Sequence, residues 1–113
     1  MPRPRKPRFV QGRPVAVAFE PNQTPPWGRI NAVLSIEGLE AIRLVDQQGL
    51  DQATAAGVMN VSRQTFGRIL AEARAIVADA LVMGKTLRIE GGDFALPYGG
   101  GRRHRRRRRG GAG

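Results

Sequence analysis

The chain has 113 residues and a formal net charge of +10, from 19 Lys and Arg against 9 Asp and Glu. It contains no cysteine, which excludes disulfides, zinc fingers, iron–sulfur clusters and cysteine nucleophiles. No apolar run approaches the roughly 18 residues that cross a membrane, and the basic N-terminus leads into no apolar stretch typical of a secretory signal. We therefore expect one small domain of a soluble, intracellular protein.

The positive charge is concentrated at the two ends of the chain. Residues 1–9 carry four cations and no acid, residues 102–109 carry seven arginines, and residues 10–98 carry eight cations and nine acids. Proline alternates with the cations of the first segment and prevents helix, which predicts an extended arm over residues 1–13. Glycine and like-charge repulsion predict a disordered tail over residues 99–113. One folded domain is left, at residues 14–98.

We expect both basic ends to contact phosphates without sequence preference. The cations concerned are Arg3, Arg5, Lys6 and Arg8 in the arm and Arg102, Arg103, Arg105, Arg106, Arg107, Arg108 and Arg109 in the tail. Two other interpretations of the tail stay open, an RNA-binding segment and a solubilising low-complexity end.

The first regular element expected is a strand. Val15, Val17 and Phe19 alternate with alanines, the pattern of a short strand, and Pro21 ends it. The loop that follows contains Trp27, the only tryptophan of the chain, which we expect to pack onto the domain.

Three helices are expected next, at residues 35–48, 51–59 and 62–83. Each begins at a residue whose side chain can cap the free amides of the first helical turn. The capping residues are Ser35, Asp51 and Ser62. Gly49 and Asn60 supply the turns between the helices, because both residue types tolerate positive φ.

The third helix has an apolar face. At about 100° per residue, that face contains Phe66, Ile69, Leu70, Ala73, Val77, Ala80 and Leu81. Gly84 ends the helix, and Leu87 and Ile89 then predict a strand that pairs with residues 15–19.

The second and third helices have the spacing of a helix-turn-helix. Ala56 is small where the helices cross, and Asn60 stands at the tight turn. Val61, Phe66 and Ile69 supply apolar contacts that fix the crossing angle. The predicted fold is mainly α, a three-helix helix-turn-helix domain with a small accessory strand pair and disordered basic tails.

The polar face of the third helix has the residue types that recognise DNA. Gln64 and Arg68 point the same way, and they suit an adenine and a guanine edge by paired hydrogen bonds. Ser62 and the first-turn amides can bond a phosphate, and Arg63 and Arg74 flank this face. A solvated face without a partner is the alternative. The turn, the small outer residues and the basic ends favour a helix in the major groove of double-stranded DNA.

The segments MPRPRKPR, SRQTFGRIL and LRIEGG, in this order, resemble a family of small uncharacterised prokaryotic proteins. Members are predicted to bind DNA through a helix-turn-helix similar to the promoter-reading domain of sigma factors. The resemblance covers roughly residues 1–94. It implies that Ser62, Arg63, Gln64, Thr65 and Arg68 contact DNA. Many members have cysteines near the N-terminus, and this chain has none, so no metal or redox role is carried over.

No catalytic constellation is recognisable in the sequence. His104 is the only histidine and lies within the arginine run, so no scaffold holds it as a base. We expect no enzyme activity, no metal and no cofactor. The predicted function is transcription regulation by sequence-specific DNA binding, in the cytoplasm and in association with the nucleoid. Two alternatives stay open, a module that docks on RNA polymerase or a regulatory protein, and an RNA binder acting through the arginine tail.

Two further expectations concern helix surfaces. Glu37 and Glu40 are expected to be solvated charges on the first helix. Ile76, Val82 and Met83 lie off the apolar face of the third helix, where a second subunit and the chain's own strands explain them equally well. A homodimer is therefore left open.

Overall fold

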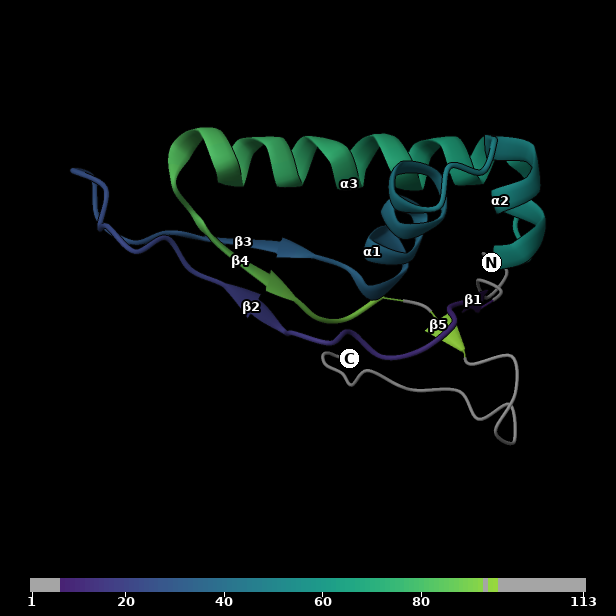
Figure 1. Ribbon diagram of the computed structural model, residues 1–113, viewed down its shortest axis with the longest axis horizontal. Coiled ribbons are helices and arrows are strands. Elements are labelled where there is room, and N and C mark those ends of the chain that lie inside the picture. The colour runs from purple at the N-terminus through teal and green to yellow at the C-terminus, as the bar shows by residue number, and fades with distance from the viewer. Residues whose placement is uncertain (1–6, 93, 96–113) are drawn as a thin grey trace, which may run out of the picture.

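The computed structural model describes residues 7–92 and 94–95. The helices are α1 (Ile36–Ile42), α2 (Gln52–Met59) and α3 (Arg63–Met83), and a π-helical segment, η1 (Arg43–Gln47), extends α1. The strands are β1 (Arg8–Phe9), β2 (Ala18–Phe19), β3 (Asn31–Leu34), β4 (Thr86–Ile89) and β5 (Phe94–Ala95). The helices lie on one side of a small sheet, with α3 running along its length (Figure 1). Residues 1–6 of the predicted basic arm and the whole arginine tail fall outside the described residues.

The three predicted N-caps are confirmed. Ser35 Oγ accepts a hydrogen bond from the Gly38 amide at 3.0 Å, which satisfies one of the free amides of α1. The carboxylate of Asp51 and the hydroxyl of Ser62 do the same for α2 and α3, at 2.7 and 3.0 Å. The helix over residues 63–83 is continuous for 21 residues, as expected.

The first helix differs from its prediction in its last turns. A single α-helix was expected over residues 35–48, but from Arg43 the backbone widens to π-helical bonding, and the Gln48 amide donates to Arg43 O at 2.8 Å. Wide turns of this kind lie mostly within or at the ends of α-helices. Leu44 remains 3% exposed on the inner side of η1, and Gly49 then turns the chain at φ 79°.

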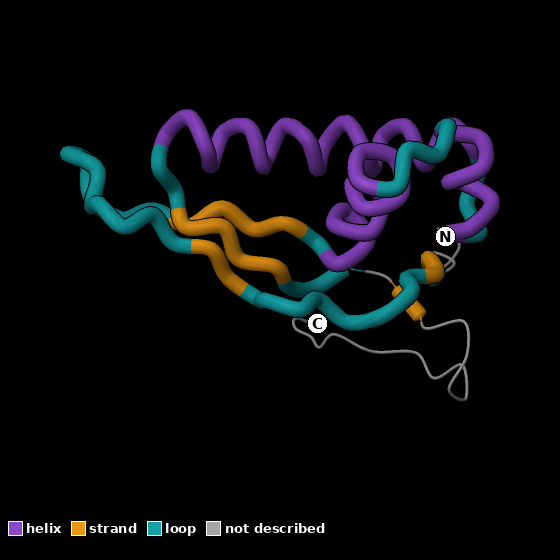
Figure 2. Tube along the Cα trace, viewed as in Figure 1, coloured by secondary structure: helices purple, strands orange, loops and turns teal. Residues whose placement is uncertain are grey.

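The sheet has three strands in the order β2–β4–β3 (Figure 2). The predicted pairing is confirmed in part. Strand β2 is antiparallel to β4 with Phe19 opposite Leu87, but it contains only Ala18 and Phe19 of the strand expected over residues 15–19. The sheet has one strand more than predicted, because β3 lies parallel to β4 on its other side, with Leu34 opposite Ile89. A separate two-residue parallel pair joins β1 to β5. These additional strands were not predicted.

Two apolar clusters hold the helices in place. The first joins α1, η1 and α2 to the amino-terminal half of α3, and its buried members are Ala41, Leu44, Ala55, Ala56, Met59, Phe66 and Leu70. The second joins the middle of α3 to the sheet through Leu34, Ala73 and Ile89. Ala56 is 3% exposed and belongs to the first cluster, as expected for a small residue where α2 meets its neighbours.

The carboxyl end of α3 is less covered than predicted. Leu81 was assigned to the buried face, yet it is 78% exposed, because the helix here runs beyond α1. Trp27 was expected to pack onto the domain and is 54% exposed, although its Nε1 donates to Met83 O at 3.2 Å. Val82 is also exposed, whereas Ile76 packs against the cluster that joins α3 to the sheet.

The acidic face of α1 is buried, and the expectation of solvated charges is wrong. Glu37 and Glu40 are 7% and 5% exposed, because the segment that begins with β1 covers this face of the helix. Arg8 pairs with Glu37 at 3.7 Å, and the Gln11 amide donates to Glu40 Oε2 at 3.1 Å. Arg43 adds two hydrogen bonds of 2.8 Å to Glu40.

This packing also corrects the predicted arm. Arg8 was assigned to phosphate contacts, but it is 8% exposed and its guanidinium faces a buried carboxylate. Val10 is 1% exposed and therefore belongs to the core. The folded part of the chain starts before residue 14, the boundary expected from the sequence.

Asn60 offers a test of the turn between α2 and α3. Its φ of 60° is left-handed, a conformation that costs most residues roughly 1–2 kcal/mol. Asn60→Val is expected to lower the free energy of unfolding by about that amount, whereas Asn60→Gly leaves it nearly unchanged. Urea denaturation followed by circular dichroism measures both. Equal losses for valine and glycine would show that the asparagine side chain, and not the backbone angle, stabilises the turn.

Candidate nucleic-acid interface

The first turn of α3 is organised by its own cap. Ser62 is exposed, accepts from the Thr65 amide at 3.0 Å and donates its hydroxyl proton to Thr65 Oγ1 at 3.0 Å. Ser62 and Thr65, both predicted to contact DNA, are therefore hydrogen-bonded to each other. The hydroxyl oxygens keep lone pairs, and the remaining first-turn amides keep the partial positive charge of a helix N-terminus.

Arg63 links the two helices. Its Nη1 donates to Gln52 Oε1, on the first turn of α2, at 3.1 Å. The prediction missed Gln52, because the distance between the two side chains depends on the angle between α2 and α3. Gly67 lies beside this pair, and a Cβ built there would be 3.7 Å from Gln52 Oε1 and 3.8 Å from Arg63 Nη1, which is ordinary contact.

Gln64 and Arg68 are brought together as predicted. Both are exposed on the outer side of α3, four residues apart, and neither has a hydrogen-bond or ionic partner among the residues that the structure describes. The backbone beneath them is fixed, since Phe66 and Leu70 on the opposite face are 0% and 1% exposed. Two polar side chains without partners among the described residues thus project from a helical segment that is packed on the core.

Arg74 occupies a different position from the rest of the predicted set. Its Nη2 and Nε donate to the two carboxylate oxygens of Asp46, at 2.6 and 3.1 Å. These bonds hold the pKa of Asp46 below its ordinary value and raise that of Arg74. The pair joins α3 to η1, so the guanidinium of Arg74 is engaged within the fold and is not grouped with Gln64 and Arg68.

Acidic side chains lie close to Arg63 and Arg68 and balance their positive charge. Asp51 begins α2, and hydrogen bonds from the backbone amide and then the hydroxyl of Thr54 hold its pKa below the ordinary value. Glu72 is exposed about one turn beyond Arg68 and was not among the residues predicted for this surface. Arg63 and Arg68 are thus accompanied by acids of similar number, and the excess positive charge of the chain lies in its end segments.

The N-terminal end of the described chain lies close to these helices. Strand β1 packs against α2, so the described chain begins beside this helix (Figure 1). Residues 1–6 hold three of the predicted phosphate-contacting cations, Arg3, Arg5 and Lys6. The first basic segment therefore joins the fold at β1, which packs against α2.

Neither metal-binding nor membrane-spanning features are found in the described part of the chain. Across residues 7–92 and 94–95, no three His, Cys, Asp or Glu side chains are grouped so that they could hold a metal ion. In the same residues, no helix combines the length and apolar character needed to cross a membrane.

Comparison with known proteins identifies the family. The family described as "Protein of unknown function DUF134" matches residues 1–96. A UPF0251 protein of Thermoanaerobacter sp. (strain X514) is 49% identical over 94 residues, covering 83% of each chain. A UPF0251 protein of Chlorobaculum tepidum is 52% identical over 90 residues, which are 80% of this chain and 59% of that one. No solved structure matches the chain. The chain belongs to the DUF134 (UPF0251) family.

Proposed function

We propose that this protein binds double-stranded DNA at preferred sequences and regulates transcription, with α2 and α3 acting as a helix-turn-helix. The observation that carries the proposal is the exposed pair of Gln64 and Arg68 on a helix whose opposite face is buried. Fixed backbone and uncommitted hydrogen-bonding groups are what recognition of base edges requires. In this proposal the amino-terminal half of α3 enters the major groove.

The turn between the helices supports the proposal. Asn60 adopts the left-handed conformation, and the Val61 amide donates back to Ala56 O at 3.0 Å, which closes α2 immediately before Ser62 starts α3. Ala55 and Ala56 are buried against the third helix, so the two helices approach closely. A short first helix, a tight turn and a capped second helix are the parts of a helix-turn-helix.

Small residues on the outer face of α3 give further support. Ala71 and Ala75 are exposed and lie on the same side as Gln64 and Arg68. An alanine would fit at Gly67 without displacing a neighbour, so the fold itself does not require glycine at that position. Small side chains allow a helix backbone to approach the floor and walls of a groove.

Substitution of Arg68 and Gln64 tests this proposal. If each side chain makes paired hydrogen bonds to a base, Arg68→Ala and Gln64→Ala each cost about 1–3 kcal/mol on the preferred site and relax the preference at one base pair. The preferred site is obtained by selection from random duplexes at a stated salt concentration, and affinities are measured by fluorescence anisotropy.

Arg88→Ala is the matched control, because Arg88 is an exposed cation on β4 that pairs with Glu90, away from α3. It removes one positive charge, as Arg68→Ala does, and is expected to leave base preference unchanged. Equal losses for Arg68→Ala on the selected and a random duplex would make Arg68 a phosphate contact and contradict base recognition. Tighter binding of the protein to RNA than to the selected duplex DNA would overturn the proposal.

A further inference from the structure

The helices leave one edge of the sheet uncovered. Phe19 on β2 stands opposite Leu87 on β4, so both side chains point to the face of the sheet on which the helices lie. Leu87 packs against the cluster beneath α3, whereas Phe19 is 56% exposed. Within the three-stranded sheet, Figure 1 shows β2 as the strand farthest from α3. The inner face of β2 therefore borders an open apolar groove.

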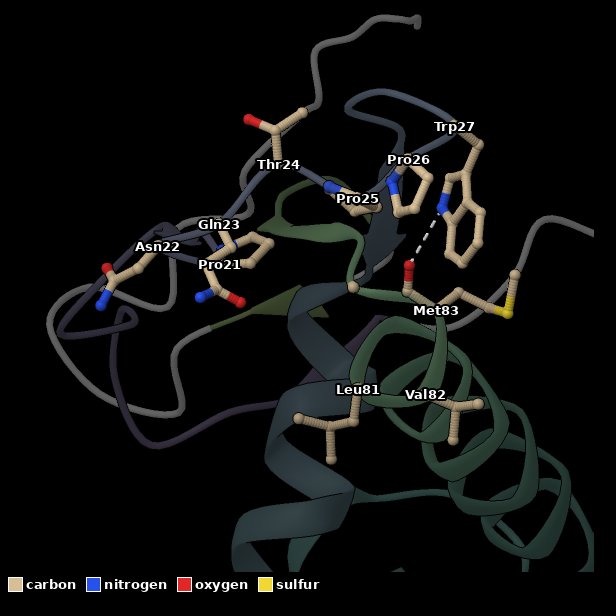
Figure 3. Close-up of a pocket in the computed structure, with 11 residues that line it drawn as sticks. Pro21, Asn22, Gln23, Thr24, Pro25, Pro26, Trp27, Leu81, Val82 and Met83 are labelled. Carbon is tan, nitrogen blue, oxygen red and sulfur yellow. Dashed lines mark hydrogen bonds between the residues drawn. The ribbon is translucent and has the colours of Figure 1, made fainter.

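The groove continues in two directions. Toward α3 it is a cavity of about 480 Å³ whose walls include Phe19, Leu39 and Leu81. Toward η1 it joins a second hollow of about 710 Å³, which shares Phe19 and Leu39 and extends to Val15. Beyond Leu81, the last turn of α3 meets the loop that carries Trp27, whose ring is held over Met83 (Figure 3). These hollows form one continuous strip.

We call this strip the apolar surface and define it by five side chains, each more than half exposed: Val15, Phe19, Trp27, Leu81 and Val82. Their exposed area is on the order of 500 Å², taking about 100 Å² for an aliphatic side chain and about 200 Å² for an aromatic ring. That is at the upper end for monomers, whose largest patch is typically about 300–600 Å². With the half-buried groove walls it approaches the roughly 800 Å² per partner of a stable interface.

The charges at the rim disfavour a nucleic acid or an acidic membrane as the occupant. The charged residues that line the two grooves are of both signs: Arg13, Glu20, Glu40, Arg43 and Lys85. Arg43 is bonded to Glu40, and Lys85 is paired with Asp79 at 2.5 Å. An anionic partner would therefore gain no net electrostatic attraction at this rim. An uncharged apolar partner can bind without breaking any of these ion pairs.

We propose that the apolar surface pairs with the same surface of a second copy of this chain. It contains both halves of a self-complementary contact, because the ridge formed by Leu81 at the end of α3 borders the groove lined by Phe19. If a two-fold axis relates the two copies and passes between the ridge and the groove, the ridge of each copy enters the groove of the other. Closed two-fold dimers are also the commonest assembly of soluble chains.

The dimer has a consequence that rests on the proposed function. The apolar surface lies at the carboxyl end of α3, and the segment from Gln64 to Arg68 lies at the other end, about 24 Å along the helix from Val82. Two such helices inclined at a large angle bring their reading segments to about 34 Å apart, one turn of DNA. The preferred DNA site would then be two-fold symmetric.

The oligomeric state of the full chain, without DNA, tests the dimer. Sedimentation equilibrium over a concentration series is expected to give twice the chain mass of 12.3 kDa. Phe19→Glu and Leu81→Glu each place an unpaired carboxylate in the contact and are expected to raise the dissociation constant by about a hundredfold. Both positions are more than half exposed, so the fold tolerates the change, and circular dichroism verifies it.

Ala75→Glu is the matched control, an exposed alanine of α3 outside the apolar surface, and it should leave the dimer unchanged. Because the chain has no cysteine, a mixture of Phe19→Cys and Leu81→Cys chains should oxidise to the mixed dimer in preference to either symmetric product. A wild-type monomer at every concentration overturns the proposal, even if a hydrophobic dye occupies the groove. So does a dimer that survives both glutamate substitutions. Arg68→Ala should retain the dimer, which separates this result from the outcome for DNA recognition.

Discussion

Replacing Glu40 by alanine is expected to lower the free energy of unfolding by about 3 kcal/mol, the lower end of the loss found when one member of a buried ion pair is removed. The carboxylate is 5% exposed and accepts three hydrogen bonds, two from Arg43 and one from the Gln11 amide. Alanine leaves the guanidinium and the amide without their acceptor. The lower end of the range applies because the Arg43 side chain is 32% exposed and can turn toward water.

Asp46→Ala is the matched control, since Asp46 also accepts two hydrogen bonds from one arginine but is 40% exposed. A loss of less than about 1 kcal/mol is expected for this exposed pair. Arg74 holds the pKa of Asp46 below its ordinary value, so this small contribution is present at neutral pH and disappears as the pH falls through that lowered pKa. Urea denaturation measures both variants, and equal losses at neutral pH would show that burial does not govern the strength of the Glu40 pair.

The features that were predicted correctly depend on local sequence. A serine or aspartate cap, a left-handed asparagine and a terminating glycine act within about one helical turn. They were sufficient to place the starts of all three helices and the end of α3 at Gly84. The outward direction of Gln64 and Arg68 follows from helical periodicity in the same way.

The features that were missed depend on contacts between distant segments. Strand β3 is defined by its parallel partner β4, more than 50 residues later, and the four residues NAVL have no alternation that announces a strand. Glu37 and Glu40 are three residues apart between apolar positions, which is the spacing of a solvent-exposed helix face. They are buried only because β1 and Gln11 pack against this face of α1. Arg74 shares a flank with Arg63, but its pairing with Asp46 depends on the position of η1.

The charge distribution separates two contributions to the proposed DNA binding. The part of α3 that carries Gln64 and Arg68 is packed on the core through Phe66 and Leu70. It has little net charge around it, since Asp51 and Glu72 accompany Arg63 and Arg68. The arginines at positions 102–109 lie outside the described residues and supply seven positive charges. Base preference should therefore come from α3, and most of the salt-dependent affinity should come from the ends of the chain.

Deleting residues 102–113 is accordingly expected to weaken binding to selected and random duplexes by similar factors, of about a thousandfold at low salt if the seven arginines contact phosphates. The slope of log affinity against log salt concentration should flatten by about 0.9 for each phosphate that the shortened chain no longer neutralises. Replacing the seven arginines by glutamine, with the chain length kept, is the matched control and should act as the deletion does.

Base preference is expected to survive in both tail variants, because a polycation contacts the phosphates that every duplex presents alike, whereas Gln64 and Arg68 contact base edges. Arg68→Ala in the full chain should give the opposite pattern, with a nearly unchanged salt slope and a weaker preference. A tail-less chain that keeps its salt slope and loses its preferred site would contradict this division, since the arginine segment would then recognise sequence and α3 would not.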